Sequence, residues 1–258
     1  MRRPVPLMAW SVAGLILFFG GWQAAVSGGL VSPFVLPSPL GVLERAWTMT
    51  FVRPFAGAYL HQHAVSSIGR FLGGFGLAAL IGVPLGLMMG RFRLLEDIVT
   101  PLFEGYRYVA PLAWVPFAAL WFGTGIGGAI MVIFTGAFAP CLINAYRGAR
   151  MVDRHLIEAA QTHGAGELRI AREVLLPGAL PSIVAGLRIA AGLGWQSLIG
   201  AELIVVSSGI GYVMIQGQSN LSPETVMTAM LVIGVVGLLI DIALRAAERA
   251  VRRKWEGA

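Results

Sequence analysis

The amino-acid sequence predicts an all-α membrane protein with six transmembrane helices and one polar loop between the fourth and fifth. Of its 258 residues, 57% are hydrophobic and only 12% are charged, whereas soluble domains carry about 25% charged residues. The mean hydropathy is +0.76. The charges gather between apolar runs of about 20 residues, the length at which a helix crosses a bilayer. A soluble fold of this size could not bury so much apolar surface.

Six apolar runs qualify as spans. They are residues 7–25, 71–89, 99–122, 126–145, 183–206 and 226–244. We expect a single transmembrane domain over residues 1–258, in which residues 1–65 hold the first span and an extracytoplasmic connector and residues 66–247 hold a five-helix core. The connector begins VSPFVLPSPLGVLERAWTM, a proline-rich stretch followed by an amphipathic one, which indicates a segment lying at the membrane interface.

The N-terminal segment could also be a signal peptide, because a charged start precedes its apolar run. That run is long for a signal, and no clean A-x-A cleavage site follows it. We therefore expect the first span to be retained. Its removal would leave the other five spans in the same orientation.

The positive charges indicate the orientation of the spans. Cytoplasmic connections of membrane proteins carry an excess of arginine and lysine, which places four segments, two of them the termini, in the cytoplasm. The charges in those segments are Arg2, Arg3, Arg91, Arg93, Arg147, Arg150, Arg154, Arg169, Arg172, Arg245, Arg249, Arg252, Arg253 and Lys254. An even number of spans agrees with this arrangement.

Several functions are excluded by composition. The net charge of +6 comes mostly from arginines that lie between the apolar segments rather than on one face, so it does not indicate nucleic-acid binding. Cys141 is the single cysteine, so no intramolecular disulfide can form, and Lys254 is the single lysine, so no G-x-x-x-x-G-K-[ST] phosphate loop is present. The histidines lack metal-ligand spacing, and no Ser/His/Asp grouping occurs. We therefore predict no catalytic, cofactor-binding or metal-binding residues on this chain, and any nucleotide hydrolysis must occur on another polypeptide.

Glycines recur every four residues in the second span, at Gly82, Gly86 and Gly90. This spacing leaves one stripe of the helix without side chains and predicts close helix packing. The alternative is that glycine is simply common in membrane helices.

The third span contains Pro101, Pro111 and Pro116, each of which removes a helix hydrogen bond and bends the rod. Glu104 and Arg107 lie three residues apart on one face of it. Charges are costly inside a bilayer, so these two side chains either pair and line a translocation path or extend to the cytoplasmic surface.

The fifth span places Gln196, Ser197 and Glu202 deep in an apolar stretch. Unsatisfied polar groups cost several kcal/mol in a membrane. These residues are therefore candidates for the translocation path, and hydrogen bonding to a neighbouring helix is the alternative.

The polar loop, residues 153–177, has a strongly ordered pattern. Asp153 can cap a short helix, and Gly164 supplies a stop because glycine adopts the left-handed conformation that ends helices. A second amphipathic turn follows over residues 167–175. A residue before proline is disfavoured as helix, so we expect a bend at Leu176 and a new helix whose first turn contains Pro181.

The same loop resembles a family signature. The order is Glu158-Ala159-Ala160, three residues, Gly164, nine residues, then Val174-x-Leu176-Pro177. It is similar to the EAA motif of type I ABC importer permeases. Other segments, including SSIGRFLGGFGLAALIGVPLG and APLAWVPFAALWFGTG, resemble permeases for nitrate, taurine, aliphatic sulfonates and similar small anions such as bicarbonate.

The resemblance implies a role for the loop. In this family the first short helix is a coupling helix, which seats in a groove on a separate ATPase subunit that binds ATP and magnesium. The implied ATPase-coupling residues are Glu158, Ala159, Ala160, Gly164, Leu176 and Pro177. The other implied partners are a second permease copy, a periplasmic or lipid-anchored solute-binding protein and membrane lipid, all at a bacterial inner membrane.

Two alternatives remain open from the sequence. One is an ABC permease for another small solute, such as a pyrimidine precursor or an organic cation. The other is an ion-driven secondary transporter in which the intramembrane carboxylates carry protons. Dependence of uptake on ATP separates the second alternative from the importer.

Overall fold

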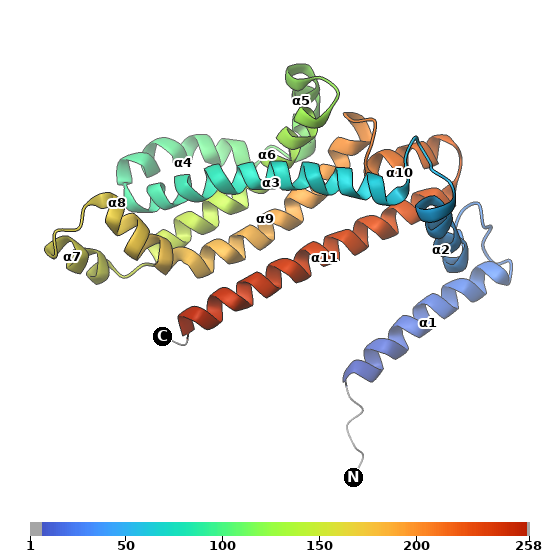
Figure 1. The fold of residues 1–258 in the computed structure, drawn as a ribbon, viewed down its shortest axis with the longest axis horizontal. Coiled ribbons are helices and arrows are strands. Elements are labelled where there is room, and N and C mark those ends of the chain that lie inside the picture. The colour runs from blue at the N-terminus through green and yellow to red at the C-terminus, as the bar shows by residue number, and fades with distance from the viewer. Residues whose placement is uncertain (1–6, 257–258) are drawn as a thin grey trace, which may run out of the picture.

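A computed structural model describes residues 7–256, and every regular element in that range is a helix apart from one isolated bridge. Three long helices, α3, α6 and α9, lie side by side as the core, and α11 runs along them (Figure 1). Their bounds are Leu60–Arg91 for α3, Ile126–Arg150 for α6, Leu176–Ile204 for α9 and Pro223–Glu256 for α11. Each is long and apolar enough to cross a membrane.

The core helices α3 and α6 touch along the predicted glycine stripe. A Cβ atom at Gly82 would lie 2.9 Å from the Cβ of Cys141, and one at Gly86 would lie 2.9 Å from the Cβ of Ala145. A Cβ atom at Gly90 would lie closer still to the Cβ of Ala149 on the next turn of α6. Carbon atoms in contact are about 3.5–4.0 Å apart, so any side chain at these positions would force the two helices apart.

The prediction of one continuous third span over residues 99–122 is wrong. The chain there forms α4, a break, a short 3₁₀ turn η2 and then α5, with bounds Arg93–Arg107, Pro111–Trp114 and Val115–Phe122. Ala110 is extended, with ψ of 137°, because the ring of Pro111 disfavours the helical conformation in the residue before it. In Figure 1, α4 ends partway along α3, and α5 turns away from it.

The polar loop also differs from the prediction at its second half. It contains α7 (Arg154–Thr162), α8 (Glu167–Ile170) and the π-helical turn η3 (Ala171–Leu175), and η3 continues directly into α9. The predicted bend at Leu176 is absent, since this residue is helical with φ −61° and ψ −48°.

The π-helical turn explains why the chain stays helical there. A π turn adds one residue to the helical repeat, and the N–H of Leu176 bonds back to the carbonyl of Ala171. The widened turn makes room for the ring of Pro177, which would clash in a regular helix interior. Pro181 consequently lies inside α9 rather than at its start.

The helical bundle has two distinct ends. The α7 end carries the polar loop and the C-terminal part of α11, and the α10 end carries three short helical elements (Figure 1). Those helices are α2 (Pro39–Trp47), the π turn η1 (Thr48–Val52) and α10 (Ile210–Ser219). The first span is α1 (Leu7–Ser27), which lies apart from the core and meets α2.

Two boundaries expected between parts of the domain fall inside helices. Residues 65 and 66 are both in α3, which begins at Leu60 rather than at residue 71, and residue 247 is in α11. The N-terminal arginines Arg2 and Arg3 lie outside the described residues.

Candidate functional site

The helix α7 projects from the α7 end with no buried side chain. Asp153 caps it by accepting a 2.9 Å hydrogen bond from the backbone N–H of His155. Arg154 and Glu158 form an ion pair of 2.8 Å along its surface, and Leu156 is 58% exposed. An amphipathic helix that leaves much of its apolar face exposed is suited to seat against another protein.

Gly164 ends this projecting helix in the predicted way. Its φ is +75°, in the left-handed region that glycine adopts without steric cost. The N–H groups of Gly164 and Ala165 bond to the carbonyls of Gln161 and Ala160, which satisfies acceptors left free at the helix end. The chain therefore reverses sharply after α7.

The segment after Gly164 is fixed to the core. Arg91, the last residue of α3, donates two hydrogen bonds to the carboxylate of Glu167, of 3.1 Å and 2.7 Å. Ile170 and Leu175 are buried. The projecting helix α7 is thus joined to α9 through a short helical segment that is anchored to α3.

A first hollow of about 530 Å³ opens between the end of α4, α6 and α9. Its lining includes Arg107, Tyr108 and Asn144. Arg107 forms a 2.8 Å ion pair with Glu104, and its Nη2 donates a 3.0 Å hydrogen bond to the hydroxyl of Tyr108. The pair is partly exposed, at 34% for the Arg107 side chain and 45% for that of Glu104. Of the two interpretations open from the sequence, pairing beside a cavity is the one that this geometry favours.

Gln196 and Ser197, although adjacent, differ in position. Gln196 is exposed and lines a second hollow of about 520 Å³ between α9 and α11. Ser197 is buried against Gly136 of α6 and donates a 2.7 Å hydrogen bond to the carbonyl of Leu193 in its own helix. Ser197 therefore packs two helices together, and its expected place on the path is wrong for this structure.

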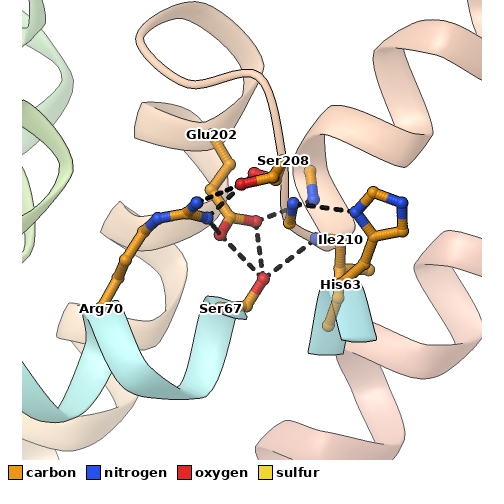
Figure 2. A network of polar contacts seen from close by, with 8 residues as sticks. His63, Ser67, Arg70, Glu202, Ser208 and Ile210 are labelled. Atoms are coloured by element: carbon orange, nitrogen blue, oxygen red, sulfur yellow. Dashed lines mark hydrogen bonds and ion pairs between the residues drawn. The ribbon is translucent and has the colours of Figure 1, made fainter. Parts of the chain in front are cut away.

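Glu202 is also wrongly expected on the path, because it is fully buried in a polar network at the α10 end. Figure 2 shows its carboxylate facing Ser67 and Arg70 of α3. Arg70 lies 2.7 Å from Oε1, and the hydroxyl of Ser67 lies 2.7 Å and 2.9 Å from the two oxygens. The oxygen Oε2 also accepts from the N–H of Gly211, at 2.9 Å. Hydrogen bonding to neighbouring elements is thus the interpretation that holds.

Side chains of the network accept hydrogen bonds from three consecutive backbone N–H groups at the start of α10. They belong to Gly209, Ile210 and Gly211, and their acceptors come from α3 and α9 (Figure 2). His63 Nδ1 accepts from Gly209 at 3.1 Å, so its Nε2 carries the proton that faces the carbonyl of Phe55, 3.0 Å away. Unpaired N–H groups and a positive dipole end make a helix N-terminus a favourable place for a carboxylate.

Sequence reasoning missed three members of this network, and a signal for them existed. His63, Ser67 and Arg70 follow one another at i, i+4 and i+7, the spacing that places polar side chains on one face of a helix. Among residues 7–256, no group of three or more His, Cys, Asp or Glu side chains is placed to hold a metal ion.

Comparison with known proteins identifies the family. Residues 82–256 match the family model described as "Binding-protein-dependent transport system inner membrane component". This chain belongs to that family. It is therefore a permease component of an ABC transporter, as the motif in the polar loop predicted.

The relatives of this permease are named for the transport of different solutes. The taurine transport system permease protein of Escherichia coli K12 is 36% identical over 96% of this chain and 90% of its own length. The putative aliphatic sulfonates transport permease protein of the same strain is 37% identical over 92% and 88%. The bicarbonate transport system permease protein of Synechococcus elongatus is 34% identical over 97% and 95%.

The solved structure of a methionine ABC transporter in inward-facing conformations has the same fold as this permease. The TM-score is 0.66 at 21% identity, over 74% of this chain and 95% of that chain. The expected type I importer permease fold is thereby confirmed.

Proposed function

We propose that this chain is the membrane permease of an ATP-driven importer and that it carries a small anion through the first hollow. Its partners are an ATPase subunit in two copies, a second copy of the permease, a solute-binding protein and membrane lipid. ATP and Mg²⁺ bind on the ATPase, and no covalent chemistry takes place on this chain. The family membership and the exposed helix α7 support this proposal.

The orientation follows from charge. Most of the arginines lie at the end of α6, in the loop around α7, at the connection between α3 and α4 and at the end of α11. We therefore place the α7 end at the cytoplasm of a bacterial inner membrane and the α10 end outward. Both termini are then cytoplasmic. The ATPase reaches α7 from below, and the binding protein delivers the solute at the α10 end.

The coupling residues follow from the motif and the geometry of the loop. Glu158, Ala159 and Ala160 lie on the projecting helix, and Gly164 closes it. Leu176 and Pro177 begin α9 directly after the anchored turn η3. In this proposal, movement of the ATPase groove pulls α7, and α9 carries that movement into the membrane.

The substrate class is a small oxyanion: taurine, an aliphatic sulfonate, nitrate or bicarbonate. The single observation that carries it is Arg107, a guanidinium on the wall of a hollow between membrane-spanning helices. A planar guanidinium offers a fork of donors that matches an oxyanion. The names of three relatives give taurine, aliphatic sulfonates and bicarbonate as the transported solutes. The first two carry a sulfonate group.

The coupling role is tested by a pair of glycine substitutions. A Cβ atom would meet nothing within 4 Å at Gly164 or at Gly166, but Gly164 has φ +75° and Gly166 has φ −74°. Gly164→Val should therefore distort the end of α7 and abolish ATP-driven uptake, while Gly166→Val keeps most of it. Both variants should insert into the membrane. Full uptake with normal ATPase stimulation in Gly164→Val would refute the coupling role.

The energy source and the substrate are tested in proteoliposomes that contain the permease with its co-purifying ATPase and the binding protein. Uptake of labelled taurine, methanesulfonate, nitrate and bicarbonate is measured with and without internal ATP. We expect uptake of at least one anion that needs ATP. Uptake driven by an ion gradient alone would establish a secondary transporter, and uptake of a pyrimidine precursor but of no anion would refute the substrate class.

A further inference from the structure

An ionic cluster joins α9 to α11 on the cytoplasmic half of the bundle. Arg188 Nε lies 2.7 Å from Asp241 Oδ1, and Arg245 Nε lies 2.7 Å from the other oxygen of the same carboxylate. Arg188 Nη1 also lies 3.5 Å from Glu248. Charged side chains within membrane helices are costly, and those that persist usually face protein or a water-filled cavity.

This cluster lies beside a series of adjoining hollows, which share lining residues. The first hollow and the second hollow share Ile189 and Leu193 of α9 as lining. The second hollow in turn shares Arg188 and Glu248 with a third hollow of about 360 Å³. An exposed face of α9 thus runs from the Arg107 wall, through the second hollow, to a group of arginines nearer the α7 end.

The charges along this face favour an anion. Three arginines, Arg188, Arg245 and Arg249, meet two carboxylates, Asp241 and Glu248, so the five side chains carry one net positive charge. The Nε of Arg249 bonds only weakly to a backbone carbonyl, at 3.3 Å. Guanidinium groups bind oxyanions through paired hydrogen bonds.

We propose that Arg188, Arg245 and Arg249 form a second anion site, at which the transported oxyanion binds after it leaves the Arg107 hollow and before it is released into the cytoplasm. This inference rests on the proposed function and assigns it an exit site. Asp241 and Glu248 act there as exchangeable counter-ions. They hold the arginines in place when the site is empty, and they compete with the anion, because conduction needs binding weak enough for release.

The experiment measures how an anion inside the vesicle slows uptake. Proteoliposomes containing the whole complex are loaded with ATP and with increasing unlabelled taurine or bicarbonate, whichever the wild-type complex transports, and the uptake of the labelled compound is followed. Arg188→Gln should raise the internal concentration that halves uptake by about tenfold, since a charged donor is lost. Asp241→Asn should lower it, because Arg188 loses the competing carboxylate.

The opposite signs separate an anion site from a structural bridge. If the cluster only holds α11 against α9, both variants break the same ion pair and change the internal inhibition equally or not at all, which would overturn the proposal. Wild-type uptake that internal anion does not slow would overturn it too. Arg93→Gln, at an exposed arginine at the start of α4, is the matched control and should keep the wild-type inhibition.

Two further arms keep the outcome clear. If Arg188→Gln fails to assemble, Arg249→Gln replaces it, because Arg249 is exposed and lines the third hollow. It should raise the half-inhibiting concentration roughly threefold, and an unchanged value would overturn the proposal. Failure of the wild-type complex to transport any anion refutes the proposed function itself. Normal transport, with the same half-inhibiting concentration in the wild type and the variants, refutes only the exit site.

Discussion

Two of the arginine–glutamate pairs in this permease, Arg70–Glu202 and Glu104–Arg107, differ in almost everything except composition. The pair Arg70–Glu202 is 7% and 0% exposed, joins two helices and takes part in a network with the start of α10. The pair Glu104–Arg107 lies within one helix, is partly exposed and faces a cavity of about 530 Å³. The first pair is built into the fold, whereas the second remains accessible to a solute.

The difference follows from the number of partners. Removal of two charges from water is favourable only if additional hydrogen bonds satisfy their remaining donors and acceptors. The carboxylate of Glu202 accepts hydrogen bonds from Ser67, Arg70 and Gly211, so its charge is balanced within the protein. Glu104 has Arg107 as its ion-pair partner, and the guanidinium keeps donors that an anion could use. The location of a charge in a span therefore says less about function than the number of its contacts.

The largest expected effect is the loss of the buried carboxylate. Glu202→Gln should lower the free energy of unfolding by about 3–5 kcal/mol, because Arg70 is left as an uncompensated buried charge and the amide cannot accept every donor that the carboxylate does. Thermal unfolding of the detergent-purified protein measures this.

The matched control is Glu104→Gln, the same change in the exposed pair, which should leave the unfolding midpoint nearly unchanged. Equal shifts in the two variants would show that burial does not distinguish the pairs.

A smaller effect is expected at Ser67. Its hydroxyl lies within hydrogen-bond distance of both oxygens of Glu202, and it accepts the N–H of Ile210 at 2.9 Å. Ser67→Ala should cost about 1–3 kcal/mol, since a buried N–H is left without a partner. Ser197→Ala serves as the control because Ser197 bonds only to a carbonyl of its own helix. The unfolding midpoint should fall more for Ser67→Ala, and the reverse order would contradict the network's role in stability.

Local patterns in the sequence predict much of this structure. The spacing of Gly82, Gly86 and Gly90 predicts close packing against a neighbouring helix, and α6 lies there. Asp153 and Gly164 predict the two ends of α7, because a capping side chain and a left-handed glycine act within a few residues. Such features depend on a single turn of the chain, so no knowledge of the tertiary structure is needed.

Features that depend on distant contacts are not predictable in the same way. A proline either breaks a helix, as Pro111 does, or is accommodated by a π-helical turn, as Pro177 is, and the sequence around each permits both. Glu202 meets residues that are more than 130 positions away, with |i−j| of 135 for Ser67 and 132 for Arg70. Its hydropathic surroundings resemble those of a pathway residue, and only the packing of α3 against α9 distinguishes the two.

Substitutions in the exposed pair Glu104–Arg107 should change transport rather than the free energy of unfolding. Arg107→Gln should raise the KM for the transported anion by about tenfold, because a charged donor is lost from the wall of the first hollow. Initial rates of ATP-driven uptake measure the change. Arg93→Gln removes the same charge at an exposed position of the same helix and should leave KM as it is. An unchanged KM in Arg107→Gln would show that this arginine only packs.

The smallest expected effect is a gain, at Glu104. In the structure this carboxylate forms an ion pair with the guanidinium of Arg107, at 2.8 Å. A transported anion must therefore compete with it for the arginine. Glu104→Gln removes that competitor and should lower KM by roughly twofold to threefold, a size typical of exposed ion pairs. Tyr108 still accepts from Arg107 at 3.0 Å, so the arginine keeps its position in the variant. The double variant Glu104→Gln with Arg107→Gln should then behave like Arg107→Gln alone, because the carboxylate acts only through the arginine. If Glu104→Gln instead raised KM, Glu104 would be orienting Arg107 for the anion rather than competing with it, and the exposed pair would resemble the buried one after all.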